Sequence, residues 1–465
     1  MQATEINPKG KRNSIDHAAK TIVVMGGGLA GLAASMALAT VRQKVYLLES
    51  KQRLGGRAGS FLDTVSGQLI DYCQHVSMGC CTNFHYFCQT IGVKHWLEPQ
   101  PVLYFFTRDG KHSLFKADPL PAPFHLTRSF WKSHYLTLPE KCRIVLGLTA
   151  LMMESPQSDP PFLDWLKKHR QNQRTIQRYW RIVLTSALNE EIENIGLRYA
   201  RKVFLDGFLR HRDSFLVHIP TVPLQRFYET ELDHWFKQHD VTTAKNQAVK
   251  EIVMQDNRIQ FLLLRDGSKI EADWYISALP FHRLLDLLPA DIVQKHSYFA
   301  KLNHLGTSPI TSVHLWLDRA ITDLPHAVIV DGISQWIFAR GQQIDGSFYY
   351  QIVISASQNL FRQGHEVIIA QLAEELRQTF PLARMAKIIH ARVVTEQRAT
   401  FRVFPGVDSF RPEPISPIGN LILAGDYTQT AWPATMEGAV RSGYRAAEII
   451  TQKIGIPNTF VQKDL

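Results

Sequence analysis

The stretch TIVVMGGGLAGLAASMALATV, from Thr21 to Val41, constrains the fold more than any other part of the sequence. It holds no charged residue and follows a basic leader, so its hydropathy alone would suit a signal peptide or a membrane anchor. The order of its residues argues against both. A β-branched run comes first, a glycine-rich turn follows, and a run of good helix formers ends the stretch. The order strand, turn, helix is typical of a βα unit in a parallel sheet.

Three glycines in the turn fit the spacing G-x-G-x-x-G. Gly26 permits a tight turn, Gly28 lets a pyrophosphate approach the backbone, and Gly31 lets the helix pack closely on the strand. The next expected strand, KVYLLES, ends at Glu49, near the distance of about 20 residues at which an acidic side chain binds the adenosine ribose. The spacing therefore predicts a dinucleotide site at a helix N-terminus. Its predicted cofactor-binding residues are Gly26, Gly28, Leu29, Ala30, Gly31 and Glu49.

The segment SKQRLGGRAGS follows directly and contains the pattern R-x-G-G-R. Its glycines bring backbone N–H groups close to a cofactor, and an arginine near the pyrophosphate supplies charge that the glycine turn lacks. A plain turn with solvated arginines is the alternative. An acidic residue followed by R-x-G-G-R is typical of flavin enzymes rather than nicotinamide enzymes, so we expect FAD as the cofactor. The predicted ligands in this segment are Arg53, Gly56 and Arg57.

The stretch NLILAGDYTQTAWPATMEGAVRSGYRAAEII, residues 420–450, repeats the order strand, loop, helix. Asp426 can bond the ribityl chain of a flavin, and Pro433 suits the first turn of the helix. The N-terminus of that helix would then point at the flavin ring. The predicted cofactor-binding residues here are Gly425, Asp426 and Met436.

Two nucleotide-type turns at opposite ends of the chain imply one discontinuous domain around one cofactor. We expect an α/β fold, α+β overall, in which a Rossmann-like FAD-binding domain carries an inserted substrate domain of mixed sheet and helices. The predicted boundaries are 1–20 for a disordered basic tail, 21–100, 220–285 and 395–455 for the FAD-binding domain, 101–219 (mostly helical) and 286–394 for the substrate-binding domain, and 456–465 for a C-terminal tail.

The cysteine content and net charge of the chain limit the compartment and the binding partners that we expect. Five cysteines, an odd number, lack zinc-type spacing, so we expect reduced thiols, no metal site and a cytosolic compartment. The net charge of +10 favours a polyanion, either nucleic acid or an anionic membrane face. The densest basic stretch, KKHRQNQRTIQRYWR, would place Arg170, Arg174 and Arg178 on one solvated helix face. No nucleic-acid motif accompanies it, so we expect no nucleic-acid partner.

Motifs in the middle of the chain narrow the class of flavin enzyme that we expect. They read DYCQHVSMGCC, RYWRIVLTSALNE, IPTVPLQRFYE, SQWIFAR, EQRATFRVFPG and TAWPATMEGAVRSG. With the glycine motifs, the chain resembles the FAD-dependent amine oxidase and phytoene desaturase superfamily. Through these central motifs it is similar to the hydroxysqualene dehydroxylases, the squalene-associated FAD-dependent desaturases of hopanoid-producing bacteria. The resemblance extends from Thr21 to about Ile450.

The resemblance implies an FAD enzyme that reductively removes the hydroxyl of hydroxysqualene, a C30 isoprenoid, to give squalene on the route to hopanoids. It also implies that Val249 contacts the adenine through its backbone. The leaving hydroxyl needs a proton, and Asp71 and His75 are the candidate donors because they follow the R-x-G-G-R loop. Each residue also has a purely structural alternative. For Asp71 it is a turn residue, and for His75 it is a structural hydrogen-bonding residue. The family pattern there resembles D-N-G-Q-H, from which Tyr72 and Cys73 depart.

Other functions stay open. A carotenoid-type polyene desaturase or an amine oxidase would oxidise its substrate instead. A prenyl-lipid binder on the same scaffold, like the Rab GDP-dissociation inhibitors, would not be an enzyme, although intact flavin motifs at both ends argue against it. Only one complete dinucleotide fingerprint is present, so we expect no built-in NADPH site and an unidentified external electron donor for FAD.

The segment 119–153 interleaves aromatic and cationic side chains ahead of an apolar helix, which suits a membrane interface or an ordinary domain lid. No second charge-free stretch approaches the roughly 20 residues that span a bilayer. A C30 hydrocarbon resides in lipid, and cations are drawn to anionic headgroups. We therefore expect a cytoplasmic protein held peripherally on the inner membrane, with Phe130 and Trp131 at the contact.

Overall fold

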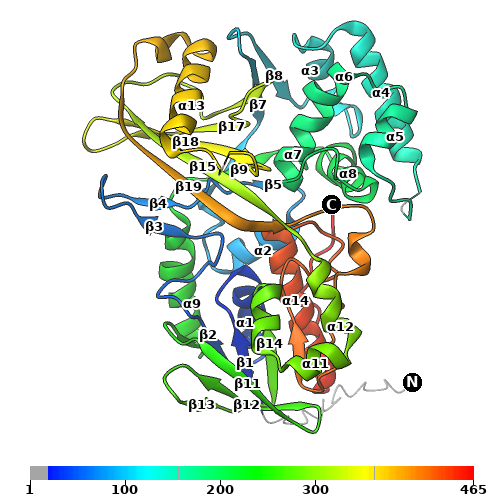
Figure 1. The fold of residues 1–465 in the computed structure, drawn as a ribbon, viewed down its shortest axis with the longest axis vertical. Helices are drawn as coiled ribbons and strands as arrows, with labels where there is room; N and C mark the ends of the chain where they lie inside the picture. Colours follow the sequence, from blue (N-terminus) through cyan, green and yellow to red (C-terminus); the bar gives the residue numbers. More distant parts are fainter. Residues whose placement is uncertain (1–18, 156, 361) are drawn as a thin grey trace, which may run out of the picture.

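A five-stranded parallel sheet forms the centre of the lower half of the molecule in Figure 1. The computed structural model describes residues 19–155, 157–360 and 362–465, so the expected disordered tail lies outside the described residues up to residue 18. The strands are short, and the strand that opens the chain is buried on almost every residue, as parallel strands covered on both faces are. In sheet order they are β10 (Thr242–Ala244), β2 (Lys44–Leu48), β1 (Thr21–Met25), β14 (Trp274–Ser277) and β20 (Leu421–Leu423).

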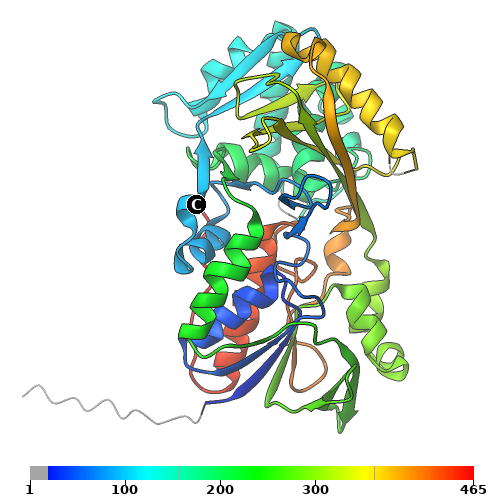
Figure 2. The same ribbon diagram turned by 90° about the vertical axis from the view of Figure 1, so that its left-hand side faces the viewer.

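Two helices from opposite ends of the chain pack side by side against this sheet (Figures 1 and 2). These are α1 (Leu29–Thr40), which is buried almost throughout, and α14 (Met436–Lys453). Gly443 makes the close packing possible, because a Cβ there would lie 2.2 Å from the carbonyl oxygen of Ala30. A parallel sheet covered by these helices confirms the expected α/β class with a Rossmann-type nucleotide-binding layer.

A seven-stranded mixed sheet forms much of the upper half of the molecule (Figure 1). Helix α13 (His365–Thr379) packs against it, with Ile368 and Leu372 in a shared apolar core. Residues 102–116 contribute a two-stranded hairpin to this sheet. The hairpin precedes the helices that make up most of the segment 101–219. The strands in order are β19 (Ile388–Phe401), β15 (Thr307–Leu317), β18 (Phe348–Ser355), β17 (Trp336–Gln342), β16 (His326–Val330), β7 (Val102–Thr107) and β8 (His112–Lys116).

Helices cover the other side of the upper half, at the top right of Figure 1. The longest of them, α4, starts with a capping box in which Thr137 and Glu140 satisfy each other's backbone N–H groups. The expected shared face of three arginines is wrong, because Arg170 has a φ of +57° in a turn that ends one helix before the next begins. The helices are α3 (Thr127–Lys132), α4 (Leu138–Met153), α5 (Phe162–Lys168), α6 (Gln173–Thr175), α7 (Ile182–Leu188) and α8 (Leu197–Phe204).

Smaller elements complete the lower half and the junction between the two halves. The buried carboxylate of Glu437, in α14, accepts hydrogen bonds from the N–H groups of Asn83 and Phe84 and so stabilises the start of α2. We continue to propose the division into an FAD-binding and a substrate-binding domain as a description of the two halves. The remaining elements are β3 (Ser60–Leu62), β4 (Leu69–Asp71), β5 (Ser77–Met78), α2 (Thr82–Thr90), β6 (Leu97–Gln100), β9 (Val217–Pro220), α9 (Leu232–Gln238), β11 (Val249–Gln255), β12 (Arg258–Leu264), β13 (Lys269–Ile270), α10 (Phe281–Leu287), α11 (Ala290–Lys295) and α12 (Ser297–Ala300).

Candidate active site

The turn between β1 and α1 forms one side of a cradle. Gly26 adopts a φ of +108°, which glycine tolerates and other residues rarely adopt. A Cβ on Gly31 would lie 1.9 Å from the carbonyl oxygen of Gly26, so only glycine lets α1 begin directly against the strand. No side chain in the described part of the chain caps α1 at Gly28. The N–H groups of the first turn are therefore available to a phosphate.

The second glycine loop lies against the first. Gly28 and Gly55 form a parallel bridge, and a Cβ on Gly56 would come within 3.0 Å of the Cα of Gly28. Glu49 lies at the same turn, because its Oε2 accepts a hydrogen bond from the N–H of Gly27 at 2.8 Å. Its buried carboxylate thus stands at the end of β2, where a dinucleotide ribose requires an acceptor.

Arg57 and Asp426 join the two ends of the sequence at this cradle. Nη2 of Arg57 lies 2.6 Å from Oδ1 of Asp426, and Nη1 donates to the carbonyl oxygen of Ala399 at 2.7 Å. Burial disfavours the charge of Arg57, but the Asp426 carboxylate more than offsets this and raises the pKa of the guanidinium above its ordinary value. The other arginine of the loop, Arg53, holds its guanidinium 4.6 Å from the ring centre of Tyr72.

Helix α14 begins at the cradle with Met436. Oγ1 of Thr435 accepts a hydrogen bond from the N–H of Gly438 at 3.0 Å and thereby caps the helix. Pro433 lies two residues before the cap at Thr435, near the first turn of the helix. The positive end of the α14 dipole faces the same cavity as the glycine loops, since Thr435 and Met436 both line it.

These groups line one cavity of about 1360 Å³. That volume exceeds the roughly 300–1,000 Å³ of a site for one drug-sized ligand, so it can hold a dinucleotide and a second large molecule. Gly31 lies behind the lining, between helix and strand, and Val249 lies outside it, where it pairs with Leu264 at the start of β11. The predicted cofactor residues that line the cavity are Gly26, Gly28, Leu29, Ala30, Glu49, Arg53, Gly56, Arg57, Gly425, Asp426 and Met436.

The walls that the upper half contributes are mostly apolar. Helices α4, α7 and α8 and strands β7, β15, β17 and β18 all supply lining residues. The strands of the seven-stranded sheet therefore line the cavity as well as packing against helix α13. Representative aromatic residues of these walls are Phe105, Phe130, Tyr179, Phe204, Trp336 and Phe338.

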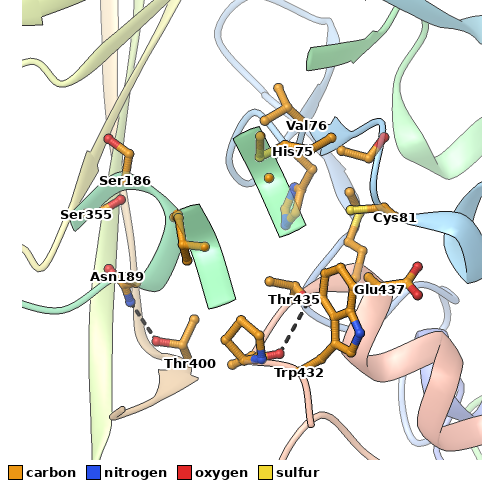
Figure 3. A pocket seen from close by; sticks show the side chains of 18 of the residues that line it. His75, Val76, Cys81, Ser186, Asn189, Ser355, Thr400, Trp432, Thr435 and Glu437 are labelled. Atoms are coloured by element: carbon orange, nitrogen blue, oxygen red, sulfur yellow. Dashed lines mark hydrogen bonds between the residues drawn. The ribbon is translucent and has the colours of Figure 1, made fainter. Parts of the chain in front are cut away.

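His75 lies on the cavity wall with its ring directed toward Thr435 in Figure 3. Its Nδ1 lies 2.9 Å from the carbonyl oxygen of Cys73. A carbonyl oxygen only accepts, so Nδ1 carries the hydrogen and Nε2 of the neutral ring is an acceptor. Burial is the main cause that lowers the pKa of His75 to about 4, with a smaller contribution from Arg57. The ring is therefore neutral at pH 7 and has no proton on Nε2 to donate.

Asp71, the other candidate proton donor, does not line the cavity. Its Oδ1 accepts hydrogen bonds from Oγ of Ser60 at 2.5 Å and from the N–H of Leu224 at 2.9 Å. Burial raises the pKa of this carboxyl to about 6, against the lowering effect of those hydrogen bonds. The side chain therefore ties strand β4 to the segment before α9, as a structural hydrogen bonder does.

Cys73 and Cys81 line the cavity beside these residues. Burial raises the pKa of the Cys73 thiol to about 12. The pKa of Cys81 is also raised well above its ordinary value, first by its hydrogen bond with Cys80 and then by burial. Both are therefore protonated thiols at neutral pH and poor nucleophiles. Within residues 19–155, 157–360 and 362–465, no group of three or more His, Cys, Asp or Glu side chains could hold a metal ion.

A polar group on the opposite wall, which sequence reasoning missed, includes Ser186, Ser355 and Asn189 (Figure 3). Asn189 ends α7 with a φ of +52°, and its Nδ2 donates to Oγ1 of Thr400 at 2.9 Å and to the carbonyl oxygen of Ser308 at 3.0 Å. Oγ of Ser186 is buried without a hydrogen-bond partner among the described residues. The motif SALNE marked this segment, but its pattern gave no sign that a left-handed Asn would join α7 to the sheet.

The fold and the cradle define an oxidoreductase of the FAD-dependent class. The glycine turns leave space that any Cβ would fill, and Glu49, Arg57 and Asp426 surround it with the charges that FAD requires. Residues 29–451 match the model of the flavin containing amine oxidoreductase family. The chain therefore belongs to this family, and its cofactor is FAD.

Curated relatives of similar length are carotenoid desaturases. The chain is 27% identical over 455 residues to 15-cis-phytoene desaturase of Solanum lycopersicum, covering 93% of this chain and 77% of the relative. It is 26% identical to 15-cis-phytoene desaturase of Synechococcus elongatus, covering 92% of this chain and 95% of the relative. It is 25% identical to zeta-carotene desaturase of Synechocystis, covering 92% and 96%.

Solved structures share the fold at low sequence identity. A cyclohexylamine oxidase from Brevibacterium oxydans matches with a TM-score of 0.69 and 15% identity, covering 94% of this chain and 99% of that chain. A variant of putrescine oxidase matches with a TM-score of 0.71 and 14% identity, covering 94% and 99%. An oxidoreductase from Methanosarcina mazei has a TM-score of 0.69 and 14% identity, covering 92% and 100%. These likenesses show the fold alone.

Proposed function

We propose that the protein transfers hydride between FAD and a long isoprenoid chain. The observation that carries the proposal is the single cavity of about 1360 Å³, in which the cofactor cradle continues into walls of apolar and aromatic side chains. Such walls suit a hydrocarbon substrate and exclude water from the reacting atoms. When bound, FAD supplies the hydride chemistry, and the chain's own residues bind, orient and desolvate.

Two reactions of this class are candidates. The names of the curated relatives support the oxidation of a carotenoid-type polyene better than they support any other reaction. The reductive removal of the hydroxyl of hydroxysqualene, giving squalene for hopanoid synthesis, is supported by the central sequence motifs. A specific feature of the site also favours it, because polar residues, His75 on one side and Ser186 and Ser355 on the other, lie on opposite walls of the chamber.

We propose that His75 positions an alcohol rather than protonating it. Nε2 of the neutral ring can accept the O–H of a substrate hydroxyl, while the Cys73 carbonyl holds the ring in that tautomer. Asp71 is no longer a candidate proton donor, since it does not line the cavity and its Oδ1 is bonded to Ser60 and Leu224. We further propose that an external donor supplies the electrons for a reductive reaction.

Anaerobic product analysis distinguishes the two reactions. The holoprotein receives hydroxysqualene after chemical reduction of its FAD, and phytoene with its FAD oxidised, each in detergent micelles. Loss of the oxygen atom in the first mixture, seen by mass spectrometry, supports dehydroxylation, whereas loss of two hydrogens in the second supports desaturation. If both substrates return unchanged, an isoprenoid reaction of either kind is wrong.

We propose that the protein works peripherally on the inner face of the cytoplasmic membrane, where such a substrate resides. No helix among the residues that the structure describes is both long and apolar enough to cross a bilayer. Of the two residues predicted to contact the membrane, Phe130 and Trp131, we retain only Trp131. Phe130 is only 9% exposed and lines the cavity, so it cannot anchor the protein in lipid, whereas the exposed Trp131 can.

A further inference from the structure

The outer face of α4 carries an apolar stripe that points into solvent. Leu138, Val145 and Met152 recur every seven residues and so fall on one side of the helix. Leu146 and Met153 lie beside them, with 69% and 83% of their surfaces exposed. The opposite side of α4 already packs against α3, α6 and α8, so the stripe has no partner in the described structure. An ordinary domain lid would bury its apolar side and expose its polar side.

The stripe continues into the mouth of the substrate cavity. Val145 and Met152 are exposed and also line the cavity. The same is true of Phe124, which is 59% exposed, and of Trp131, which is 40% exposed. We call the five residues of the stripe together with Phe124 and Trp131 the mouth surface. A molecule that leaves the cavity here meets apolar side chains rather than water.

The exposed charged side chains between Pro119 and Met153 are all positive. Arg128, Lys132 and Arg143 are exposed along the same segment. The one acidic residue between Pro119 and Met153 is Glu140, which is buried and held by the guanidinium of Arg174 at 2.6 Å. A rim of cations around exposed aliphatic and aromatic residues matches the boundary between anionic headgroups and acyl chains.

We propose that the mouth surface docks on an anionic lipid bilayer and opens the cavity directly to the acyl chains. Docking inserts the stripe into the acyl region and leaves the cations among the headgroups. A second copy of the chain fits this surface less well, because a two-fold contact would bring the cations of both copies together. The identity of the lipid that enters the cavity rests on the proposed function. The docking itself rests on the exposed apolar residues and the cations of the mouth surface.

Sedimentation of the holoprotein with vesicles tests the proposal. The vesicles contain phosphatidylcholine alone or with phosphatidylglycerol, and no isoprenoid is added. We expect binding to the anionic vesicles at low salt and release at high salt. The double variant Leu146→Ser/Met153→Ser should partition about tenfold more weakly, since it exposes two polar groups in the acyl region.

The matched control carries Leu62→Ser and Val65→Ser in the β3–β4 hairpin, where the two residues are 61% and 69% exposed. It should bind like the wild type. Docking by this surface is wrong if the wild type ignores anionic vesicles at low salt, or if both double variants bind equally. It is also wrong if light scattering shows a dimer that the stripe variant dissociates, since a second copy then covers the surface.

Turnover in detergent separates this proposal from the proposed function. Both double variants should convert a detergent-dissolved isoprenoid at the wild-type rate, because neither pair of substitutions touches the cofactor cradle. Vesicle binding without any isoprenoid turnover would support docking while refuting the proposed function. Turnover in detergent without vesicle binding would support the proposed hydride transfer and refute docking.

Discussion

The guanidinium of Arg57 lies 2.6 Å from the carboxylate of Asp426, although the two residues come from opposite ends of the chain. The contact closes the cofactor cradle, because one residue follows the second glycine loop and the other follows β20. Asp426 is mostly buried, and Arg57 places an opposite charge beside it. FAD binding and the association of the two chain ends are therefore linked at one ion pair.

We predict that Asp426→Asn lowers the affinity for FAD by about tenfold or more, because the variant loses both the charge that orients Arg57 and an acceptor for the cofactor. The ratio of flavin absorbance to protein absorbance, and titration of the apoprotein with FAD, measure the change. Asp273→Asn is the control, since it weakens the exposed Lys20–Asp273 pair at 3.3 Å and leaves the cradle intact. Equal FAD affinity in both variants would contradict the prediction.

Gly443→Val should destabilise the holoprotein by about 1–3 kcal/mol or more and reduce its FAD content. Its Cβ would meet the carbonyl oxygen of Ala30 at 2.2 Å and push α14 away from α1, and both helices line the cradle. Urea unfolding of the purified protein measures the loss. Gly364→Ala is the comparison, because a Cβ there meets nothing within 4 Å, and a similar loss in that variant would show that crowding is not the cause.

The stability of the protein should depend on pH through Asp71. Burial raises the pKa of its carboxyl to about 6, whereas an unfolded chain has an Asp pKa near 3.8. Between these values the folded state binds more protons than the unfolded state, so stability rises as the pH falls. Relative to Asp71→Asn, the wild type should gain about 2 kcal/mol between pH 7 and pH 4.

Urea unfolding at pH 5 and pH 7.5 checks this prediction. The Asn side chain still accepts from the N–H of Leu224 but does not titrate, so the difference between the two proteins isolates the carboxyl. A difference in stability that stays constant with pH would show that Asp71 does not carry the raised pKa.

His75→Phe should bind hydroxysqualene about tenfold more weakly and bind squalene as tightly as the wild type, because only the alcohol uses Nε2. Perturbation of the flavin absorbance during titration in micelles reports both affinities. The alcohol affinity of the wild type should stay constant between pH 5.5 and pH 8, well above the pKa of about 4. A variant that weakens both ligands equally would assign His75 a packing role.

The sequence by itself determined the cofactor cradle. Gly26, Gly31 and Gly56 satisfy steric conditions that arise from neighbouring backbone, and Glu49 follows the first two at a fixed strand length. Spacing along the chain expresses such local conditions directly. The same holds for α14, since its cap and its small residues lie within a few turns of one another.

Only the tertiary structure decided which side chains face the cavity and which face solvent. Asp71 and His75 stand close together in the sequence, yet one bonds Leu224 behind the cavity and the other projects into it. Likewise Phe130 is buried and Leu146 exposed, although both lie in one apolar and aromatic segment. The direction of a side chain depends on the elements packed around it, and those come from distant parts of the chain. Local sequence patterns therefore specify the cradle but not the substrate chamber or its mouth.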